Sequence, residues 1–352
     1  MSRIAIIGAG GWGTGLAIAL SRKGRHHICL WAREKEVCES ITQTRINRQF
    51  LPDFPIPQGV QATTDYKTAL DGAQIVISVV PSQHCRSVFN EIHPYLAPEM
   101  MLVSAAKGLE NDTLMRMSEV MGHVVENARG FAPRLGVLSG PSFAKEVARG
   151  DPTAITIASR DTALGETVQR EFSDPRFRVY TNEDIIGVEL GGALKNVIAI
   201  AAGICNGLGL GHNSVAALIT RGLAEITRLV LACGGRQETM AGLAGLGDLV
   251  LTCTGELSRN RNVGVELGRG SKLQEIIAGM HGMVAEGILT TNAAVGLARA
   301  RGVEMPITAQ MHAILHDEKS PHDAIRDLMT RSAKSETGLR RSETPSETQS
   351  HN

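Results

Sequence analysis

The sequence GAGGWG occupies residues 8–13, directly after the apolar run RIAII at 3–7 and before a stretch, 14–22, that is compatible with a helix. It fits the pattern GxGxxG. Glycines in this setting permit a tight turn, let the backbone approach a pyrophosphate, and bring the helix close to the strand. The N-terminus of the helix then offers free N–H groups and a positive dipole to the anion. Because both flanking elements are expected, the motif favours dinucleotide binding over a glycine-rich loop without function.

Short β-rich runs alternate with longer amphipathic segments through the first half of the chain. The expected strands are 3–7, 28–31, 75–80, 101–105, 136–138 and 154–158. This rhythm is typical of a mostly parallel sheet with helices on both faces. After about Asp184 no clear strand remains, and helical spacing continues to about Thr330. We therefore predict an α/β Rossmann-type dinucleotide-binding domain over 1–186, an all-α domain over 187–331, and a disordered polar tail over 332–352.

Composition and charge limit the classes of partner. The chain has 352 residues, 43% of them hydrophobic, and 36 basic side chains balance 36 acidic ones. With a formal net charge of zero, no global field would draw the protein to nucleic acid or to an anionic membrane. No signal peptide is recognised, and the most apolar stretch, 197–204, is far shorter than a membrane span. We expect a cytoplasmic protein with a small-molecule substrate and without stable membrane insertion.

Cysteine and histidine spacings give no sign of a metal centre. The six cysteines are scattered without a CxxC pair, which favours free thiols in a reducing compartment. His312 and His316 are four residues apart, but no Glu lies between them as HExxH chemistry requires. We predict no metal.

The residue at the end of the second expected strand bears on the choice of cofactor. NAD-specific folds usually carry an acidic residue there to hold the ribose hydroxyls, whereas this chain has Arg33. A guanidinium can pair with the 2′-phosphate of NADP, and Glu34, which follows, keeps NAD open. The alternative is an ordinary surface arginine. The sequence thus predicts NADP or NAD as the cofactor, without strict specificity for NAD.

Two lysines stand out. Lys195 lies within GGALKNVI at 191–198, and burial there would lower its pKa toward the range useful in general acid–base catalysis. It could then protonate a carbonyl oxygen as hydride arrives, although the pattern alone fits a snorkelling surface lysine equally well. Lys107 follows the expected strand 101–105, at the edge where open α/β sheets bind ligands. A second ammonium there would polarise the same carbonyl and lower the pKa of Lys195 by repulsion.

Two polar groups in the second half are further candidates. Asp248, within GLGDL at 245–249, needs a partner if it is buried; Lys195 is our candidate, and a helix N-cap is the alternative. Thr252 follows one helical turn later and could share its face. The run SRN at 258–260 joins a hydroxyl, a guanidinium and an amide, which suits a phosphate group, although a solvated loop is the alternative.

These segments also carry a family resemblance over about residues 3–330. The chain resembles the bacterial NAD(P)-dependent glycerol-3-phosphate dehydrogenases in many motifs that follow in the same order. They include IAIIGAGGWGTGLA at 4–17, VISVVPSQ at 76–83, SAAKGLE at 104–110, LSGPSFAKEVARG at 138–150, LAGLGDLVLTCTGELSRNRNVG at 243–264 and VAEGILTT at 284–291. Two departures are small: Gly11 and Gly15 stand where the family commonly has Ser and Ala.

The resemblance implies hydride transfer between NAD(P)H and dihydroxyacetone phosphate, giving sn-glycerol 3-phosphate for glycerophospholipid synthesis, on a fold similar to that of 6-phosphogluconate dehydrogenase. It implies Lys195 as the general acid/base, with Lys107 and Asp248 as catalytic partners. It implies cofactor contacts for Gly8, Gly10, Gly11, Trp12, Gly13, Arg33, Lys107, Ala144, Arg259, Val284 and Glu286. It implies substrate contacts for Lys107, Gly140, Ser142, Lys195, Asn196, Asp248, Ser258, Arg259 and Asn260. A homodimer is one option for the assembly.

Two other functions fit part of the pattern. The β-hydroxyacid dehydrogenases and ketopantoate reductases also join a Rossmann domain to helices and use a Lys/Asn pair, but the SRN run and the segment LAGLGDL argue against them. A catalytically silent NAD(P)-sensing module would bind dinucleotide and regulate a partner. The presence of Lys107, Lys195 and Asp248 together argues against such a module.

Overall fold

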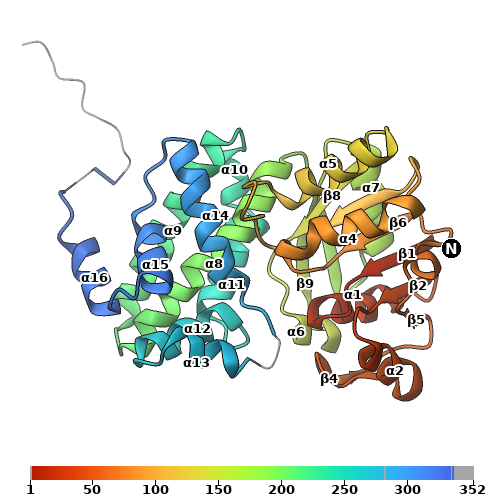
Figure 1. Ribbon diagram of the computed structural model, residues 1–352, viewed down its shortest axis with the longest axis horizontal. Coiled ribbons are helices and arrows are strands. Elements are labelled where there is room, and N and C mark those ends of the chain that lie inside the picture. Colours follow the sequence, from red (N-terminus) through yellow and green to blue (C-terminus); the bar gives the residue numbers. More distant parts are fainter. Residues whose placement is uncertain (1, 281–282, 334, 337–352) are drawn as a thin grey trace, which may run out of the picture.

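An eight-stranded sheet is the centre of the N-terminal domain, in the order β10-β9-β8-β7-β6-β1-β2-β5. The computed structural model, which describes residues 2–280, 283–333 and 335–336, places this domain beside a helical C-terminal domain (Figure 1). The strands are β1 (Ser2–Ile7), β2 (His26–Trp31), β5 (Val60–Thr63), β6 (Ile75–Ser78), β7 (Met101–Ser104), β8 (Arg134–Ser139), β9 (Thr153–Ala158) and β10 (Phe177–Asn182). Neighbouring strands run parallel except β8 and β9, which are antiparallel.

All six expected strands are present, so the mostly parallel sheet is confirmed. Strands β5 and β10, which lie at the two edges of the sheet, were not predicted. In β10 the side chains of alternate residues are exposed, and β5 has one fully buried residue in four. Edge strands bury less of their surface, and for that reason their apolar signal in the sequence is weak. The short hairpin of β3 (Ile46–Asn47) and β4 (Leu51–Pro55) was also missed.

The helix after the glycine-rich turn, α1 (Gly11–Ser21), begins three residues earlier than predicted. Gly8 has a φ of +122°, which favours glycine, and a Cβ on Gly13 would lie 2.0 Å from the carbonyl oxygen of Gly8. The turn is therefore tight enough for the helix to start within the motif. As a result, the free N–H groups of α1 stand at the carboxyl end of β1, where an anion can reach them.

Apolar side chains fill both faces of the sheet. Consecutive residues alternate between the faces, as the period of a strand requires, so Ile6 and Ile7 belong to different clusters. The helices of this domain are α1, α2 (Lys35–Thr44), α3 (Tyr66–Leu70), α4 (Cys85–Ile92), α5 (Met117–Arg129), α6 (Ala144–Arg149) and α7 (Thr162–Phe172), with short 3-10 turns η1 (Ser82–His84) and η2 (His93–Tyr95). The sheet is thereby covered on both sides, as in other Rossmann-type domains.

The C-terminal domain is built around one long helix, α8 (Ile185–Gly207) (Figure 1). Around it lie α9 (His212–Ala232), α10 (Gln237–Met240), the π-helical turn η3 (Leu243–Gly247), α11 (Asp248–Thr254), α12 (Arg259–Gly268), α14 (Glu286–Ala300) and α15 (Pro306–His316). Further out, α13 (Leu273–Ala278) packs on α12 and α16 (Pro321–Met329) packs on α15. Helices α8 and α12 touch backbone to backbone, since a Cβ on Gly264 would lie 2.0 Å from the carbonyl oxygen of Ile200. The predicted all-α C-terminal domain is confirmed.

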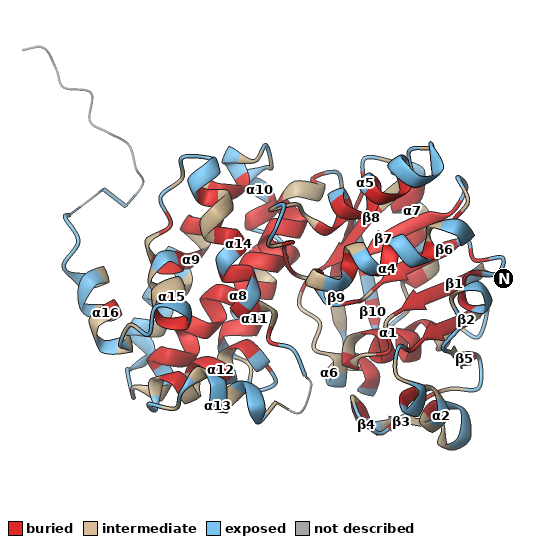
Figure 2. Cartoon of the chain, viewed as in Figure 1, coloured by how far each residue is buried: buried red, intermediate tan, exposed pale blue. Residues whose placement is uncertain are grey.

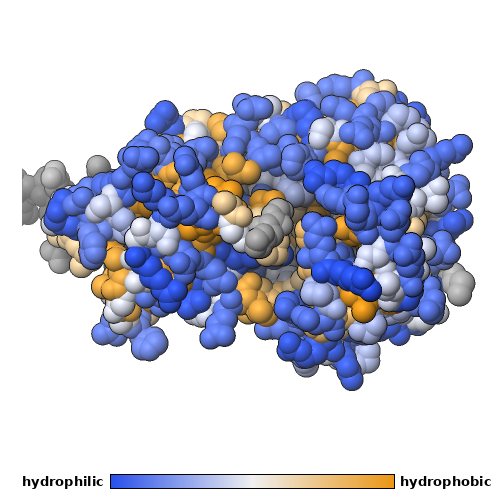
Figure 3. Space-filling model, turned by 60° about the horizontal axis from the view of Figure 1, so that its bottom comes forward, coloured by the Kyte–Doolittle hydropathy of each residue, from blue (hydrophilic) through white to orange (hydrophobic). Residues whose placement is uncertain are grey.

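Helix α8 is longer than the apolar stretch 197–204 suggested, because Lys195 and Asn196 interrupt the apolar run without ending the helix. By length and composition its 23 residues could cross a membrane, and it is the one such helix among the described residues. However, 89% of its most apolar window is buried inside the protein. Figure 2 shows it surrounded by other helices, and the face drawn in Figure 3 is mostly hydrophilic with smaller hydrophobic patches. We therefore describe α8 as the core helix of its domain.

A buried carboxylate joins α9 to α15. Glu225 is 2% exposed and accepts hydrogen bonds from the backbone N–H groups of Ile307 and Thr308 and from the Thr308 hydroxyl. We expect Glu225→Ala to lower the free energy of unfolding by about 3 kcal/mol, because it leaves buried donors without acceptors. Urea titration measures this. The exposed Glu238 in α10 is the control, and an effect of Glu225→Ala as small as that of Glu238→Ala, within about 0.5 kcal/mol, would contradict the prediction.

Two remaining expectations concern the cysteines and the tail. All six cysteines are free thiols in the structure, and Cys29, Cys85, Cys205 and Cys253 are buried. The disordered tail expected over 332–352 lies outside the described residues, apart from residues 332, 333, 335 and 336.

Candidate active site

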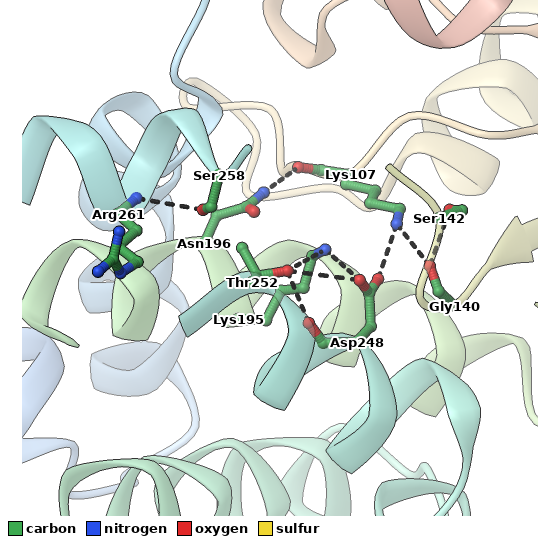
Figure 4. Close-up of polar contacts among 9 residues, drawn as sticks. All are labelled: Lys107, Gly140, Ser142, Lys195, Asn196, Asp248, Thr252, Ser258 and Arg261. Atoms are coloured by element: carbon green, nitrogen blue, oxygen red, sulfur yellow. Dashed lines mark hydrogen bonds and ion pairs between the residues drawn. The ribbon is translucent and has the colours of Figure 1, made fainter. Parts of the chain in front are cut away.

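Two lysines and an aspartate from three different elements meet between the domains (Figure 4). Lys195 comes from the middle of α8, Asp248 is the first residue of α11, and Lys107 lies in the loop after β7. Asp248 accepts a hydrogen bond from Nζ of Lys107 on Oδ2 at 2.7 Å and another from Nζ of Lys195 on Oδ1. One carboxylate therefore bridges two ammonium groups, and the predicted contact between Asp248 and Lys195 is present.

Lys195 is buried, which rules out a snorkelling surface lysine. It is 5% exposed, and its Nζ also donates to the Thr252 hydroxyl at 2.8 Å. Burial lowers the pKa of Lys195 to about 7; the charge of Asp248 opposes this shift, and the ammonium of Lys107 adds to it. Near neutral pH both protonation states are accessible. Such a group can donate or accept a proton as a reaction requires.

Asp248 does not cap a helix. Gly247 occupies the N-cap position of α11, and the Asp248 side chain makes no capping hydrogen bond. The residue is fully buried, so its charge requires partners. Lys195 and Lys107 provide them, and Thr252, one turn along α11, lies on the same face as the sequence suggested. The N-cap interpretation of Asp248 is wrong.

Lys107 is held in place by residues that we predicted to contact the substrate. Nζ of Lys107 donates to the carbonyl oxygen of Gly140 at 2.9 Å, and the hydroxyl of Ser142 donates to the same oxygen at 2.9 Å. The side-chain amide of Asn196 donates to the carbonyl oxygen of Lys107 at 3.1 Å. The structure thus brings Gly140, Ser142 and Asn196 into one site with the lysines.

Arg259, at the start of α12, reaches the glycine-rich turn of the other domain. A Cβ on Gly11 would lie 3.5 Å from Nη2 of Arg259 and 3.9 Å from Cβ of Ala144. Within the part of the chain that the structure describes, the Arg259 guanidinium has no hydrogen-bond or ion-pair partner. An unpaired guanidinium beside the N-terminus of α1 is well placed to bind an anion.

Ser258 and Asn260, on either side of Arg259, are not a solvated loop. Both are buried, and Ser258 is the N-cap of α12, where its Oγ accepts a hydrogen bond from the Arg261 N–H. Oδ1 of Asn260 accepts from the backbone N–H of Gly287 at 2.9 Å. Among the described residues, neither the Ser258 hydroxyl nor the Asn260 amide nitrogen donates to a protein acceptor. Each therefore keeps a donor for a ligand.

Glu286 connects the helical domain to the sheet domain. At the start of α14, its carboxylate accepts hydrogen bonds from the backbone N–H of Ser82 at 3.2 Å and from the Ser82 hydroxyl at 2.6 Å. Burial raises the pKa of Glu286, and the bonds from Ser82 oppose that shift. Val284, two residues earlier, is 37% exposed. Glu286 thus lies where the two domains meet.

The remaining cofactor candidates lie on the sheet domain. Nε1 of Trp12, in the glycine-rich turn, is buried and has no hydrogen-bond partner among the residues that the structure describes. Arg33 follows β2 and pairs with Glu34 at 2.6 Å, with 70% of its side chain exposed. It is free to turn toward a ligand, because an exposed ion pair of this kind contributes little stability.

Two further residues, Asn47 and Ser82, support this region and were not predicted from the sequence. Asn47 is fully buried, and its amide donates to the carbonyl oxygen of Ala9 and to the hydroxyl of Thr14, both at 2.8 Å. It thus fastens the β3–β4 hairpin to the glycine-rich turn. Ser82 is the other, through Glu286. The only signal for Asn47 was an asparagine between Ile46 and Arg48 in a mostly polar segment, which does not identify a partner.

The described residues contain no group of three or more His, Cys, Asp and Glu side chains that could hold a metal ion. The rings of His312 and His316 contact each other, with centroids 4.9 Å apart.

Comparison with known proteins decides the family. The family model for the N-terminus of NAD-dependent glycerol-3-phosphate dehydrogenase matches residues 3–165, and the model for its C-terminus matches residues 184–326. The chain belongs to this family. Two relatives named glycerol-3-phosphate dehydrogenase (NAD(P)+), from Koribacter versatilis and Acidobacterium capsulatum, are 67% and 55% identical over 96% of this chain and all of their own length.

A crystal structure of the Coxiella burnetii glycerol-3-phosphate dehydrogenase is 42% identical and has a TM-score of 0.89, covering 94% of this chain and 99% of the other. The resemblance stated from the sequence is thereby confirmed, together with the Rossmann-type and helical domains. As an NAD(P)-dependent glycerol-3-phosphate dehydrogenase family member, the chain is an oxidoreductase that uses NAD or NADP.

Proposed function

We propose that this protein interconverts dihydroxyacetone phosphate and sn-glycerol 3-phosphate, with Lys195 as the general acid/base. The observation that carries the proposal is the buried Lys195–Asp248–Lys107 bridge in a member of this family. A lysine with a pKa of about 7 suits proton transfer to or from an alcohol oxygen in both directions.

The residues around the glycine-rich turn fit a nicotinamide dinucleotide. The N-terminus of α1 and the guanidinium of Arg259 suit its pyrophosphate, and the buried Nε1 of Trp12 is a further donor there, since neither side chain has a partner among the described residues. Ala144 and Glu286 lie at the same interface between the domains. When bound, the cofactor supplies or accepts the hydride.

During reduction of the ketone, the substrate oxygen gains negative charge. Lys195 in its ammonium form donates a proton to that oxygen, and Lys107 stabilises the developing charge. Asp248 orients both ammonium groups through its two oxygens, while Thr252 fixes the position of Nζ of Lys195. In the opposite direction the neutral Lys195 accepts the proton of the hydroxyl. Arg259 and the donors of Ser258 and Asn260 hold the terminal phosphate of the substrate.

The direct test is turnover by the purified protein. Dihydroxyacetone phosphate is mixed with NADPH or with NADH, and loss of the reduced-nicotinamide absorbance is followed, with ketopantoate as a comparison substrate. We expect turnover of dihydroxyacetone phosphate alone. Reduction of ketopantoate without reduction of dihydroxyacetone phosphate would reassign the substrate. Cofactor binding without turnover of either would favour the sensing module.

In this proposal, the guanidinium of Arg33 binds the 2′-phosphate of NADPH. We expect Arg33→Ala to raise the KM for NADPH about tenfold, the effect of losing one charge-assisted interaction of about 1.4 kcal/mol, and to leave the KM for NADH within about twofold. Initial rates with each cofactor measure this. Equal changes in both KM values would show that Arg33 does not contact the 2′-phosphate.

The wider context is also part of the proposal. The protein acts in the cytoplasm, forms a homodimer, and supplies sn-glycerol 3-phosphate for glycerophospholipid synthesis. Its dinucleotide-binding domain spans 1–186, its catalytic domain 187–331, and its polar tail 332–352. Light scattering on the purified protein tests the dimer, and limited proteolysis tests the boundaries.

A further inference from the structure

The loop that carries Lys107, residues 105–116 between β7 and α5, is packed into the helical domain although it belongs to the sheet domain by sequence. Leu109 is fully buried within the hydrophobic cluster of the helical domain, and Leu114 packs against the same cluster. A Cβ on Gly296 of α14 would lie 3.0 Å from Cδ2 of Leu114. Leu114 has a φ of +61°, a conformation that costs energy for a residue with a side chain. Its packing must offset that cost.

A buried ion pair fixes the far end of this loop to α8. Glu189, on α8, is 6% exposed and accepts a hydrogen bond from Nη1 of Arg116 at 2.6 Å. It also accepts hydrogen bonds from the backbone N–H of Ser118 at 2.8 Å and from the Ser118 hydroxyl. Nη2 of Arg116 pairs with a second carboxylate, Glu119, which is 47% exposed. Arg116 therefore has one buried and one exposed partner.

Helix α8 holds the loop at a second point as well. The amide of Asn196 donates to the carbonyl oxygen of Lys107 itself. Glu189 and Lys195 are six residues apart on α8, which is about 9 Å along the helix axis. One rigid helix thus carries the general acid/base and the two residues, Glu189 and Asn196, by which α8 holds the Lys107 loop. The sheet domain adds Gln83, whose amide donates to the carbonyl oxygen of Leu109 at 2.6 Å.

We propose that Glu189 is a positioning residue, which through Arg116 and Ser118 holds the loop so that Lys107 meets Asp248. Glu189 acts through the loop and does not touch the substrate. This inference rests on the proposed function, since it takes Lys107 and Lys195 as the groups that act on the substrate. A buried ion pair brings little net stability, because desolvation opposes the attraction of the charges. The pair of Arg116 and Glu189 therefore contributes the orientation of the loop more than it contributes stability.

The variant Glu189→Gln tests the proposal with almost no change of shape. In either orientation of the amide, its nitrogen would face a donor, the Arg116 guanidinium or the Ser118 backbone N–H, so the loop would be displaced. We expect kcat for dihydroxyacetone phosphate to fall about 10- to 100-fold, because a misplacement of about 1 Å has such effects, with KM for the cofactor within about twofold. The matched control is Glu119→Gln, which removes the exposed carboxylate from the same guanidinium. Its kcat should stay within about twofold of wild type.

The pH profile separates positioning from general damage. The charged or titratable groups that face Lys195 are Asp248, Lys107 and the thiol of Cys253. If Lys107 moves away, Lys195 loses a like charge and keeps Asp248 to itself, and its pKa rises. The pH above which ketone reduction declines should then move upward by about 0.5 or more in Glu189→Gln. Loss of folded protein would reduce the rate without moving this part of the pH profile, which we call the pH limb of ketone reduction.

The outcomes are distinct. A kcat and a pH limb in Glu189→Gln that match those of Glu119→Gln would overturn the proposal. If Glu189→Gln does not fold, Ser118→Ala removes one donor to Glu189 and keeps the ion pair. It should lower kcat about threefold with a shift of the limb in the same direction, and wild-type behaviour would overturn the proposal. Wild-type protein that does not reduce dihydroxyacetone phosphate would instead refute the proposed function.

Discussion

Lys195→Met is expected to lower kcat for dihydroxyacetone phosphate reduction by at least about a thousandfold while cofactor binding is retained. The variant loses both proton donation and a positive charge close to the developing oxyanion, and each of these contributes about 100-fold or more in enzymes. Methionine is similar in length and apolar, so the buried pocket of α8 can accept it. Steady-state rates and the fluorescence of bound reduced nicotinamide give the two quantities.

The control for this variant is Lys67→Met, which changes an exposed lysine of α3. Its kcat should be that of the wild type. In the wild type, reduction should decline as pH rises through about 7, because Lys195 must be protonated, and glycerol 3-phosphate oxidation should rise over the same interval. A Lys195→Met protein that keeps more than about a tenth of the wild-type rate would assign proton transfer to another group.

The fold was predictable where burial leaves a strong pattern. Strands β1 and β6 lie inside the sheet and read as continuous apolar runs, and the glycine-rich turn locates the first helix. Strands β5 and β10 escaped prediction because each has a neighbour on one side only and exposes part of its surface. The start of α1 was misplaced, since glycines carry no helical signal of their own.

The members of the site and the contact between Asp248 and Lys195 were predictable, but the other connections were not. An isolated buried Asp248 demands a cation, and Lys195 was the obvious candidate in an apolar helix. Nothing in the sequence indicated that Lys107 shares the same carboxylate, because the two residues are 141 positions apart. The pair of Arg116 and Glu189, 73 positions apart, was invisible for the same reason. Such pairs depend on how two domains meet, which local patterns do not encode.

Asp248→Asn should have the second largest effect, a decrease of kcat by about 100- to 1,000-fold. The change removes the one carboxylate that Lys107 and Lys195 share, and breaking a buried pair in this way costs about 3–5 kcal/mol. Lys195 then has no counter-charge and faces the ammonium of Lys107 alone. We expect the free energy of unfolding near pH 7 to fall by about 3 kcal/mol, measured by urea titration.

The pH dependence of the free energy of unfolding follows from the lowered pKa of Lys195. The folded pKa of Lys195, about 7, is already below its ordinary value of 10.5, so the unfolded chain binds more protons between these values and stability rises with pH there. Without Asp248 the pKa of Lys195 falls further, and this window extends to lower pH. The stability deficit of Asp248→Asn should therefore be largest below about pH 7, where the wild type still holds Lys195 as a paired ammonium.

The pH profile of the activity of Asp248→Asn should also shift to lower pH. Its limb for ketone reduction should move to lower pH, whereas that of Glu189→Gln should move to higher pH, because one variant removes an attraction on Lys195 and the other removes a repulsion. The matched control is Asp53→Asn, an exposed aspartate that pairs with Lys145, which should leave the limb in place. Shifts of the same sign in both variants would mean that the limb belongs to a group other than Lys195. Opposite shifts would identify Lys195 as the titrating group, with Asp248 and Lys107 as its opposing neighbours.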